Sequence, residues 1–323
     1  MKKARIAAAA LLAAVMLTAC GSTDSSSASE ASSTAVSEVT TTAAESVSES
    51  VAENAAESVS ESTSDGAAES VSESAPESTA DSTEESEAES TAEAKSYKSI
   101  KLMTMGDSIT DGFWREGGYR VFLCDKLEEN GLSQYVDFVG SQKSGSCYDN
   151  EHEGYTAYAI EGFTVRGIGS RSGIAKFAPD KIKEFQPDVL TLMIGTNDIL
   201  SQYDLDNAGN RLEALVDSCL EALPEGGKLY LASIPDMDAD NHTYINEKKF
   251  TVESMDEMVA SYNEKVKALV EKKQGEGRNI EFCDIHGVMT KDDLYDGVHP
   301  TTDGYRKIAN FWYDIITSCI SES

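Results

Sequence analysis

The chain has 323 residues, with 57 acidic and 27 basic side chains and a net charge of −30 at neutral pH. This charge argues against nucleic acid or an anionic membrane surface as a partner, because neither offers a cationic face. The composition is uneven along the chain, so length alone is a poor guide to the number of domains.

Residues 1–20 have the pattern of an export signal. Three basic residues precede an apolar run over 6–16, which is too short to span a bilayer. The sequence LTAC at 17–20 resembles the lipobox of bacterial lipoproteins, and this resemblance implies cleavage before Cys20 and a lipid anchor on that cysteine. We therefore expect an exported protein, either anchored at the cell surface through Cys20 or secreted, that meets the membrane only through this lipid.

Residues 21–96 consist mainly of Ser, Ala, Glu and Thr and contain no aromatic residue. The octamer AAESVSES recurs at positions 43, 55 and 67, and a fixed period first suggests a solenoid. Each repeat, however, offers one Val and a few Ala for burial, too little to offset the entropy lost on ordering its backbone. We expect a disordered, acidic tether.

Residues 97–323 have the composition of one globular domain. Near-continuous apolar runs predict strands at 99–105, 135–140, 188–194, 228–234 and 279–285. Helical patterns lie at 117–130, 172–185, 207–222, 252–273 and 301–319. Alternating strands and helices predict the α/β class, a three-layer α/β/α domain with a five-stranded parallel sheet. Ligands of such domains bind at the carboxyl ends of the strands.

Polar residues follow the first predicted strand in the sequence GDSIT at 106–110. A tight turn here would expose the hydroxyl of Ser108 at the edge of the sheet. The structural alternative is that the polar residues only cap the next helix.

Two more polar motifs follow the third and the fifth predicted strands. In IGTNDI, Asn197 either holds its own turn or directs its amide toward a developing oxyanion. In YDGVHP, Asp296 precedes His299 by three residues, although His299 is alternatively an ordinary loop histidine. All three motifs fall at one edge of a parallel sheet, which favours an active site.

Together these motifs resemble the SGNH, or GDSL-type, hydrolase superfamily, whose blocks read here GDSIT, GTND (195–198) and DGVH (296–299). The resemblance implies a flavodoxin-like fold and a Ser-His-Asp hydrolase without a cofactor. Ser108 is then the nucleophile, His299 the general base and later acid, and Asp296 the residue that orients the imidazole.

The same resemblance implies an oxyanion hole made by the N–H of Ser108, the side chain of Asn197 and a backbone N–H from a second block. The segment HEGYTAYAIEG (152–162) resembles the EGxxGW segment of carbohydrate esterase family three, where acetyl xylan esterases are found, and Ala157 stands in place of the second glycine. Gly154 and Gly162 are the alternatives to Ala157. A second likeness, GGYR (117–120), is interpreted as the start of a helix.

The loops near the predicted site are rich in Tyr, Asn, Asp and Gly and contain no long aliphatic patch. A sugar ring needs a flat aromatic face and hydrogen bonds, whereas a lipase needs an apolar trough. We therefore expect a monomeric esterase that removes acetyl groups from an extracellular polysaccharide or oligosaccharide such as xylan, with Asp107, Trp114 and Tyr155 contacting the substrate.

Two alternatives stay open at this point. One is a lysophospholipase or general esterase of the same superfamily, and the other is a carbohydrate-binding surface lipoprotein without turnover. A metal site is not expected, because His152, His242 and His286 lie in separate loops without paired spacing. The five cysteines after Cys20 lack CxxC spacing and are expected to be mostly buried thiols.

Overall fold

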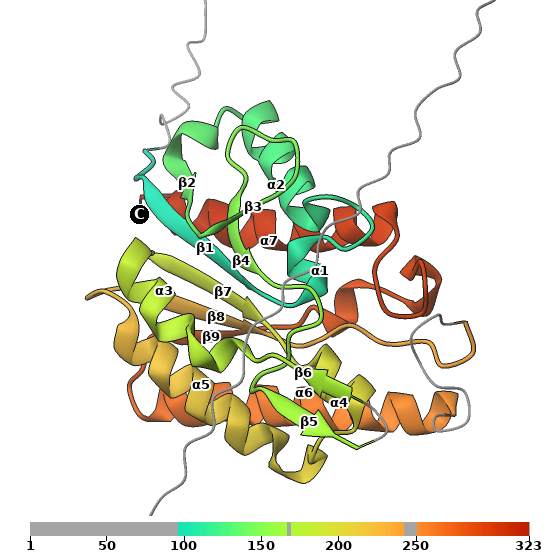
Figure 1. Cartoon of the computed structure of the whole chain (residues 1–323). Helices are drawn as coiled ribbons and strands as arrows, with labels where there is room; N and C mark the ends of the chain where they lie inside the picture. Colours follow the sequence, from blue (N-terminus) through green and yellow to red (C-terminus); the bar gives the residue numbers. More distant parts are fainter. Residues whose placement is uncertain (1–95, 167–168, 242–250, 323) are drawn as a thin grey trace, which may run out of the picture. The chain divides into compact units, whose positions relative to one another are not determined.

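The computed structural model describes residues 96–166, 169–241 and 251–322 (Figure 1). The expected signal peptide, Cys20 and all of the expected tether except Ser96 lie outside these residues, as does His242. None of the helices within the described ranges is long and apolar enough to cross a bilayer.

A seven-stranded sheet forms the centre of the domain. Its parallel strands are β1 (Ile100–Gly106), β2 (Val136–Phe138), β4 (Glu151–Gly154), β7 (Val189–Met193), β8 (Lys228–Ala232) and β9 (Ile280–Cys283). On one side of β1 the order is β7, β8 and β9, and on its other side lie both β2 and β4. The edge strand β3 (Gln142–Lys143) is antiparallel to β4.

All five predicted strands are present and parallel, but the prediction of a five-stranded sheet missed β3 and β4. Both are short and polar, and β4 has the sequence EHEG, so neither shows the apolar pattern of a strand. Tertiary pairing stabilises them instead, because Met105 and Gly106 of β1 lie in register with Glu153 and Gly154 of β4.

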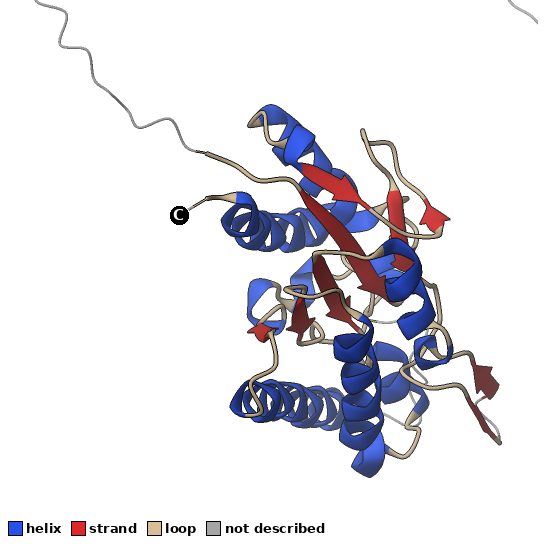
Figure 2. Cartoon of the chain, turned by 90° about the vertical axis from the view of Figure 1, so that its left-hand side faces the viewer, coloured by secondary structure: helices blue, strands red, loops and turns tan. Residues whose placement is uncertain are grey.

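Helices cover both faces of the sheet, which makes the predicted three layers (Figures 1 and 2). One face packs against α2 (Gly118–Glu129) and α7 (Thr302–Ile320), and the other against α3 (Ala178–Phe185), α5 (Ala208–Ala222) and α6 (Val252–Gly275). The predicted helix at 172–185 is α-helical only from Ala178, and its first part contains the 3₁₀ turn Ile174–Lys176.

Side chains of β1 enter two separate cores. Leu102 packs in the core beneath α2 and α7, whereas Met103 and Met105 pack in the core beneath α3, α5 and α6. Burial on both faces explains the near-continuous apolar runs that identified the central strands.

Two short helices start where central strands end. α1 (Ser108–Asp111) follows β1, and α4 (Thr196–Ser201) follows β7. A separate hairpin of β5 (Phe163–Val165) and β6 (Gly169–Arg171) lies apart from the central sheet (Figure 1). The carboxyl edge of the parallel strands therefore carries α1, α4 and the loops around them, where the polar motifs lie.

Candidate active site

Ser108, His299 and Asp296 form one chain of hydrogen bonds. Oγ of Ser108 lies 2.8 Å from Nε2 of His299, and Nδ1 of His299 lies 2.8 Å from Oδ2 of Asp296. Because the carboxylate accepts the proton on Nδ1, Nε2 is the acceptor for the Ser108 hydroxyl. A serine hydrolase requires this arrangement of nucleophile, base and orienting acid.

Asp296 is held in place by its own loop. Its Oδ1 accepts hydrogen bonds from the N–H groups of Val298, at 3.1 Å, and of His299, at 2.8 Å. Burial acts to raise the pKa of Asp296, but these bonds and the one from the imidazole outweigh burial and lower it. The carboxylate is therefore charged at neutral pH and fixes the orientation of the imidazole.

Asp107 lies at the start of α1 and is fully buried. Its Oδ1 accepts a hydrogen bond from the N–H of Ile109 at 3.0 Å, which makes it the N-cap of this helix. Burial raises the pKa of Asp107 to about 6, although the hydrogen bond from Ile109 opposes the shift. The expectation that Asp107 contacts substrate is therefore corrected: it holds the turn that presents Ser108.

A small cavity of about 120 Å³ opens beside Ser108. Its lining residues are Ser108, Phe113, Thr156, Ala157, Arg171, Asn197, Leu200, Val298 and His299. The N–H of Ser108 belongs to the first turn of α1, where a helix leaves N–H groups without intrahelical partners. The amide of Asn197 donates one hydrogen bond to the carbonyl of Tyr158 at 2.8 Å and has a second N–H to offer.

Of the three alternatives for the second block, only Ala157 lines this cavity. Gly154 instead packs against α1, where a Cβ would lie 2.4 Å from the backbone nitrogen of Asp111, and Gly162 lines a different cavity. Ala157 has a φ of +67°, the left-handed conformation that glycine adopts more readily. Ala157, Ser108 and Asn197 thus border one small space.

The other two predicted contact residues do not line the cavity beside Ser108. Trp114 is 40% exposed, stacks on Tyr295 with ring centroids 4.2 Å apart, and donates from Nε1 to the carbonyl of Pro300 at 2.9 Å. Tyr155 bonds to Glu153 through its hydroxyl and packs its ring against Tyr158 and Phe177. Tyr155 therefore supports neighbouring side chains, and Trp114 lies on the surface beside the loop of His299.

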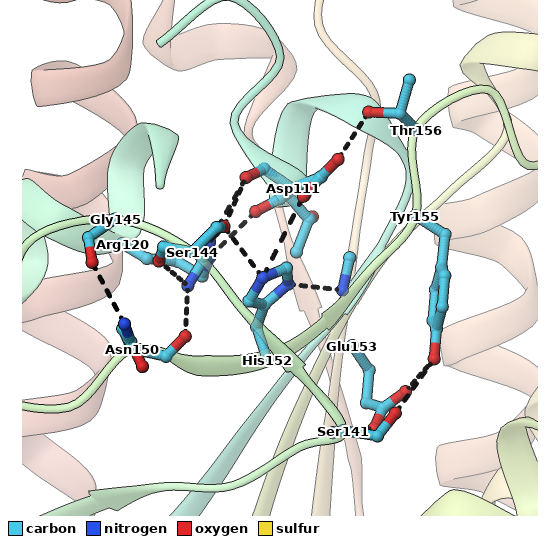
Figure 3. A network of polar contacts seen from close by, with 12 residues as sticks. Asp111, Arg120, Ser141, Ser144, Gly145, Asn150, His152, Glu153, Tyr155 and Thr156 are labelled. Atoms are coloured by element: carbon cyan, nitrogen blue, oxygen red, sulfur yellow. Dashed lines mark hydrogen bonds and ion pairs between the residues drawn. The ribbon is translucent and has the colours of Figure 1, made fainter. Parts of the chain in front are cut away.

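A polar network behind α1, which no motif in the sequence predicted, holds this helix in place (Figure 3). Arg120 is 1% exposed and donates from Nε to the carbonyl of Thr110 at 2.9 Å. From Nη2 it donates to the carbonyl of Asp111 at 3.3 Å and to Oγ of Ser144 at 2.7 Å. A buried cation thus binds the last carbonyls of the helix that begins with Ser108.

His152 completes this network as a neutral imidazole. Burial, with the nearby charge of Arg120, lowers the pKa of His152 to about 3. Its Nδ1 accepts from the N–H of Gly154 at 3.0 Å, so its proton is on Nε2, which donates to Ser144 Oγ at 2.9 Å. Ser144 accepts from both Arg120 and His152, and its own hydroxyl donates to the carbonyl of Asp111 at 3.3 Å.

Hydrogen bonds also connect the segment around Ala157 to the end of β1 and to α1. The N–H of Tyr155 donates to the carbonyl of Gly106 at 3.0 Å, and Thr156 Oγ1 donates to Asp111 Oδ2 at 2.5 Å. The turn of Ser108 and the segment of Ala157 are therefore one connected unit.

Among the described residues, no group of three or more His, Cys, Asp or Glu side chains is arranged to hold a metal ion. The five cysteines within the same ranges have free thiols, and Cys124, Cys219 and Cys283 are buried.

Residues 102–312 match the GDSL-like lipase/acylhydrolase family, and the chain belongs to this family. Its fold is the SGNH hydrolase fold, as the three sequence blocks predicted.

Three similar proteins are informative. A multidomain esterase from Ruminococcus flavefaciens is 34% identical over 238 residues, which cover 70% of this chain and 29% of that esterase. A family 3 carbohydrate esterase from Clostridium thermocellum is 28% identical with a TM-score of 0.52, and the match covers 69% of this chain and all of that structure. A carbohydrate esterase family 3 structure from Talaromyces cellulolyticus, 21% identical with a TM-score of 0.53, shares the fold over 68% of this chain and 97% of its own.

Proposed function

We propose that this protein is a serine esterase that removes acetyl groups from a polysaccharide, such as xylan, through an acyl-Ser108 intermediate. The observation that carries the proposal is the hydrogen-bonded chain from Ser108 through His299 to Asp296 beside a cavity of about 120 Å³. Family membership and the likeness to carbohydrate esterases support it.

In the first half of the reaction, Oγ of Ser108 attacks the acetyl carbonyl while Nε2 of His299 takes the hydroxyl proton. Negative charge develops on the carbonyl oxygen, and the N–H groups of Ser108 and Ala157 with the amide of Asn197 stabilise it. The imidazolium then gives its proton to the sugar oxygen, the ester C–O bond breaks, and the sugar leaves as an alcohol.

In the second half, water attacks the acetyl-Ser108 ester. His299 accepts a proton from this water and returns it to Oγ as the ester opens, which restores the free serine and releases acetic acid, which ionises to acetate at neutral pH. Asp296 stays charged throughout and stabilises the imidazolium of each half-reaction.

The size of the cavity supports a short acyl group. Its volume of about 120 Å³ is well below the range of about 300–1,000 Å³ that small-molecule sites usually have. An acetyl group has three heavy atoms, whereas the acyl chain of a lysophospholipid has many more. We therefore expect kcat/KM to fall steeply from acetyl to octanoyl aryl esters, and a rising series would favour the lysophospholipase alternative.

Acetate release from acetylated xylan oligosaccharides by the parent, Ser108→Ala and His299→Ala proteins tests the mechanism. We expect losses of at least about 10³-fold in both variants, as for other triads. Fluorophosphonate labelling of the parent at Ser108, lost in His299→Ala, would agree. Parent-like acetate release by Ser108→Ala would exclude the proposed nucleophile, and a parent without labelling or turnover would favour a carbohydrate-binding protein.

We also propose that the enzyme is an exported monomer anchored through Cys20, with residues 21–96 as a tether that lets residues 97–323 reach an insoluble polymer. The export pattern before Cys20 supports this arrangement. In cells fed a labelled fatty acid, the parent should carry the label and Cys20→Ser should not. Sedimentation of residues 97–323 should give the mass of one chain.

A further inference from the structure

A second cavity of about 580 Å³ lies next to the one beside Ser108. Arg171 lines both cavities, so the two spaces are neighbours. The walls of the larger cavity combine aromatic rings, including those of Tyr158 and Phe163, with hydroxyl groups and the cationic side chains of Arg171 and Lys176. Its volume falls within the range that small-molecule sites usually have, about 300–1,000 Å³.

The charge of this second cavity is unusual for the domain. Residues 97–323 carry 39 acidic and 23 basic side chains, yet no acidic residue among those that the structure describes lines this cavity. In the part of the chain that the structure describes, neither Arg171 nor Lys176 forms an ion pair. Other cations, such as Arg211 and Lys307, do contact carboxylates. Arg171 and Lys176, which form no ion pair within the described ranges, therefore border a space beside Ser108.

We propose that this second cavity binds a sugar that carries a carboxylate, a uronic acid linked to the acetylated sugar. A guanidinium binds a carboxylate through two parallel hydrogen bonds, and an ammonium adds a second positive charge. The partly buried rings of Tyr158 and Phe177 offer apolar surface for the sugar ring. Because Arg171 borders both cavities, the acidic sugar lies next to the sugar whose acetyl group is near Ser108.

This inference rests on the proposed esterase function and narrows its substrate to acidic polysaccharides. The uronic acid belongs either to a branch, as in a glucuronoxylan, or to the main chain, as in a polygalacturonan. In both polysaccharides a carboxylate lies beside an acetylated sugar ring.

Paired substrates test the inference with the full-length enzyme. Acetylated oligosaccharides of both kinds are compared with the same compounds after their carboxylates have been reduced to primary alcohols. We expect the parent enzyme to have at least about a tenfold lower KM for one acidic series than for its reduced form, the size expected for hydrogen bonds to a charged group. Equal KM values within both pairs would overturn the inference.

Two variants test whether the second cavity causes the preference for acidic substrates. Arg171→Gln and Lys176→Gln should each reduce the KM ratio between the neutral and acidic substrates severalfold, and the double variant should bring it close to one. Arg166→Gln is the matched control, because Arg166 is an exposed cation close to β5 that lines neither cavity. It should keep the parent ratio. A parent-like ratio in the double variant would overturn the assignment.

Binding without turnover separates this inference from the esterase proposal. Calorimetric titration of Ser108→Ala with deacetylated acidic oligosaccharides should show binding that Arg171→Gln, added to this variant, weakens at least about tenfold. If aryl acetate hydrolysis by the parent fails while this binding persists, only the esterase proposal is lost. If hydrolysis proceeds through Ser108 but the acidic compounds bind no better than the reduced ones, only the uronic acid site is lost.

Discussion

Ala157 adopts a backbone conformation that costs an L-residue with a Cβ about 1–2 kcal/mol, and its φ is +67°. The residue nevertheless lines the cavity beside Ser108. A backbone donor does not depend on the side chain, so alanine preserves the proposed oxyanion contact while lowering stability. The cost is offset by the hydrogen bonds of the adjoining Tyr155 and Thr156.

We expect Ala157→Gly to raise the free energy of unfolding by about 0.5–1 kcal/mol. Relief of the left-handed strain exceeds the extra entropy that glycine gives the unfolded chain. Because the N–H is retained, kcat for an aryl acetate should stay within about twofold of the parent value. Urea unfolding and steady-state kinetics measure the two quantities.

Ala159→Gly is the matched control for this prediction. Ala159 is fully buried and lies two residues further along the same segment, without a positive φ. Its replacement by glycine should lower stability by about 1 kcal/mol. Destabilisation by Ala157→Gly of a similar size would show that positive φ is not the source of strain.

At the scale of elements, α1 is only four residues long and depends on its neighbours for its position. Arg120, from α2, binds the carbonyls of Thr110 and Asp111, and β4 packs so closely that Gly154 leaves no room for a Cβ. Ser108 is thus held from both sides by contacts to the backbone of α1. A small displacement of a reacting group lowers the reaction rate strongly. A shift of about 1 Å can lower the rate about 10²-fold.

We expect Arg120→Lys to lower kcat about 10- to 100-fold with little change in KM. A single ammonium cannot make the same forked contacts to the two carbonyls and Ser144, so α1 shifts while the substrate cavity is retained. The rate of fluorophosphonate labelling at Ser108 should fall in parallel with kcat. If Arg120 only stabilised the fold, Arg120→Lys would lower stability but leave kcat and the labelling rate per folded molecule unchanged.

Arg115→Lys serves as the control, because Arg115 is an exposed cation in the loop between α1 and α2. It should have the parent kcat and labelling rate. If Arg115→Lys lost as much activity as Arg120→Lys, the effect would belong to charge in this region and not to the forked contacts.

The sequence predicted the elements whose stability comes from their own apolar pattern, namely the five main strands and the five long helices. It did not predict β4, because that strand is polar and depends on pairing with β1. In the same way, the three polar motifs located Ser108, Asn197 and His299, since each follows a recognisable strand. The positions of Asp107 and Tyr155 depend on side-chain direction, which strand and helix patterns do not specify.

Arg120 was missed for a related reason. The GGYR segment predicts the start of a helix, and α2 does begin at Gly118. A single arginine in a helix usually points to solvent, and its burial here follows from the close packing of α1, α2 and the segment from Ser144 to Asn150. The sequence indicates this close packing only through the neighbouring Gly117 and Gly118, which let other backbone segments approach closely.

At the scale of the whole molecule, two buried groups give opposite dependences of stability on pH. His152 has a folded pKa of about 3, against 6.5 for an unfolded histidine, so the unfolded chain binds a proton that the folded chain does not. Its contribution to stability is therefore lost as the pH falls from 6.5 toward 3. Asp107, with a folded pKa of about 6 against 3.8, instead favours the folded state as the pH falls from 6 toward 4.

Comparison of the parent with His152→Asn isolates the histidine, because Asp107 contributes to both proteins. The variant should be less stable at pH 7, since it loses contacts to Ser144 and Gly154. This difference should shrink as the pH falls below 6.5, by up to about 1.4 kcal/mol per pH unit. Urea unfolding at pH 7, 6 and 5 measures it.

Ser144→Ala weakens the same network without removing a titrating ring, so its stability deficit should change much less with pH. A deficit of His152→Asn that stayed constant or grew between pH 7 and pH 5 would contradict a neutral, buried imidazole.

Hydrogen bonds join the two ends of the described domain. The N–H of Lys98 donates to the carbonyl of Ile320 at 2.8 Å, and the N–H of Glu322 donates to the carbonyl of Ser96 at 2.9 Å. Both contacts lie at the start of β1, whereas Ser108 follows its far end (Figure 1). The seven residues of β1 separate these contacts from Ser108 by about 20 Å. A module can therefore be added at either end of residues 96–322, or the two ends can be joined and new ends made in a loop far from Ser108, without blocking the cavity beside Ser108.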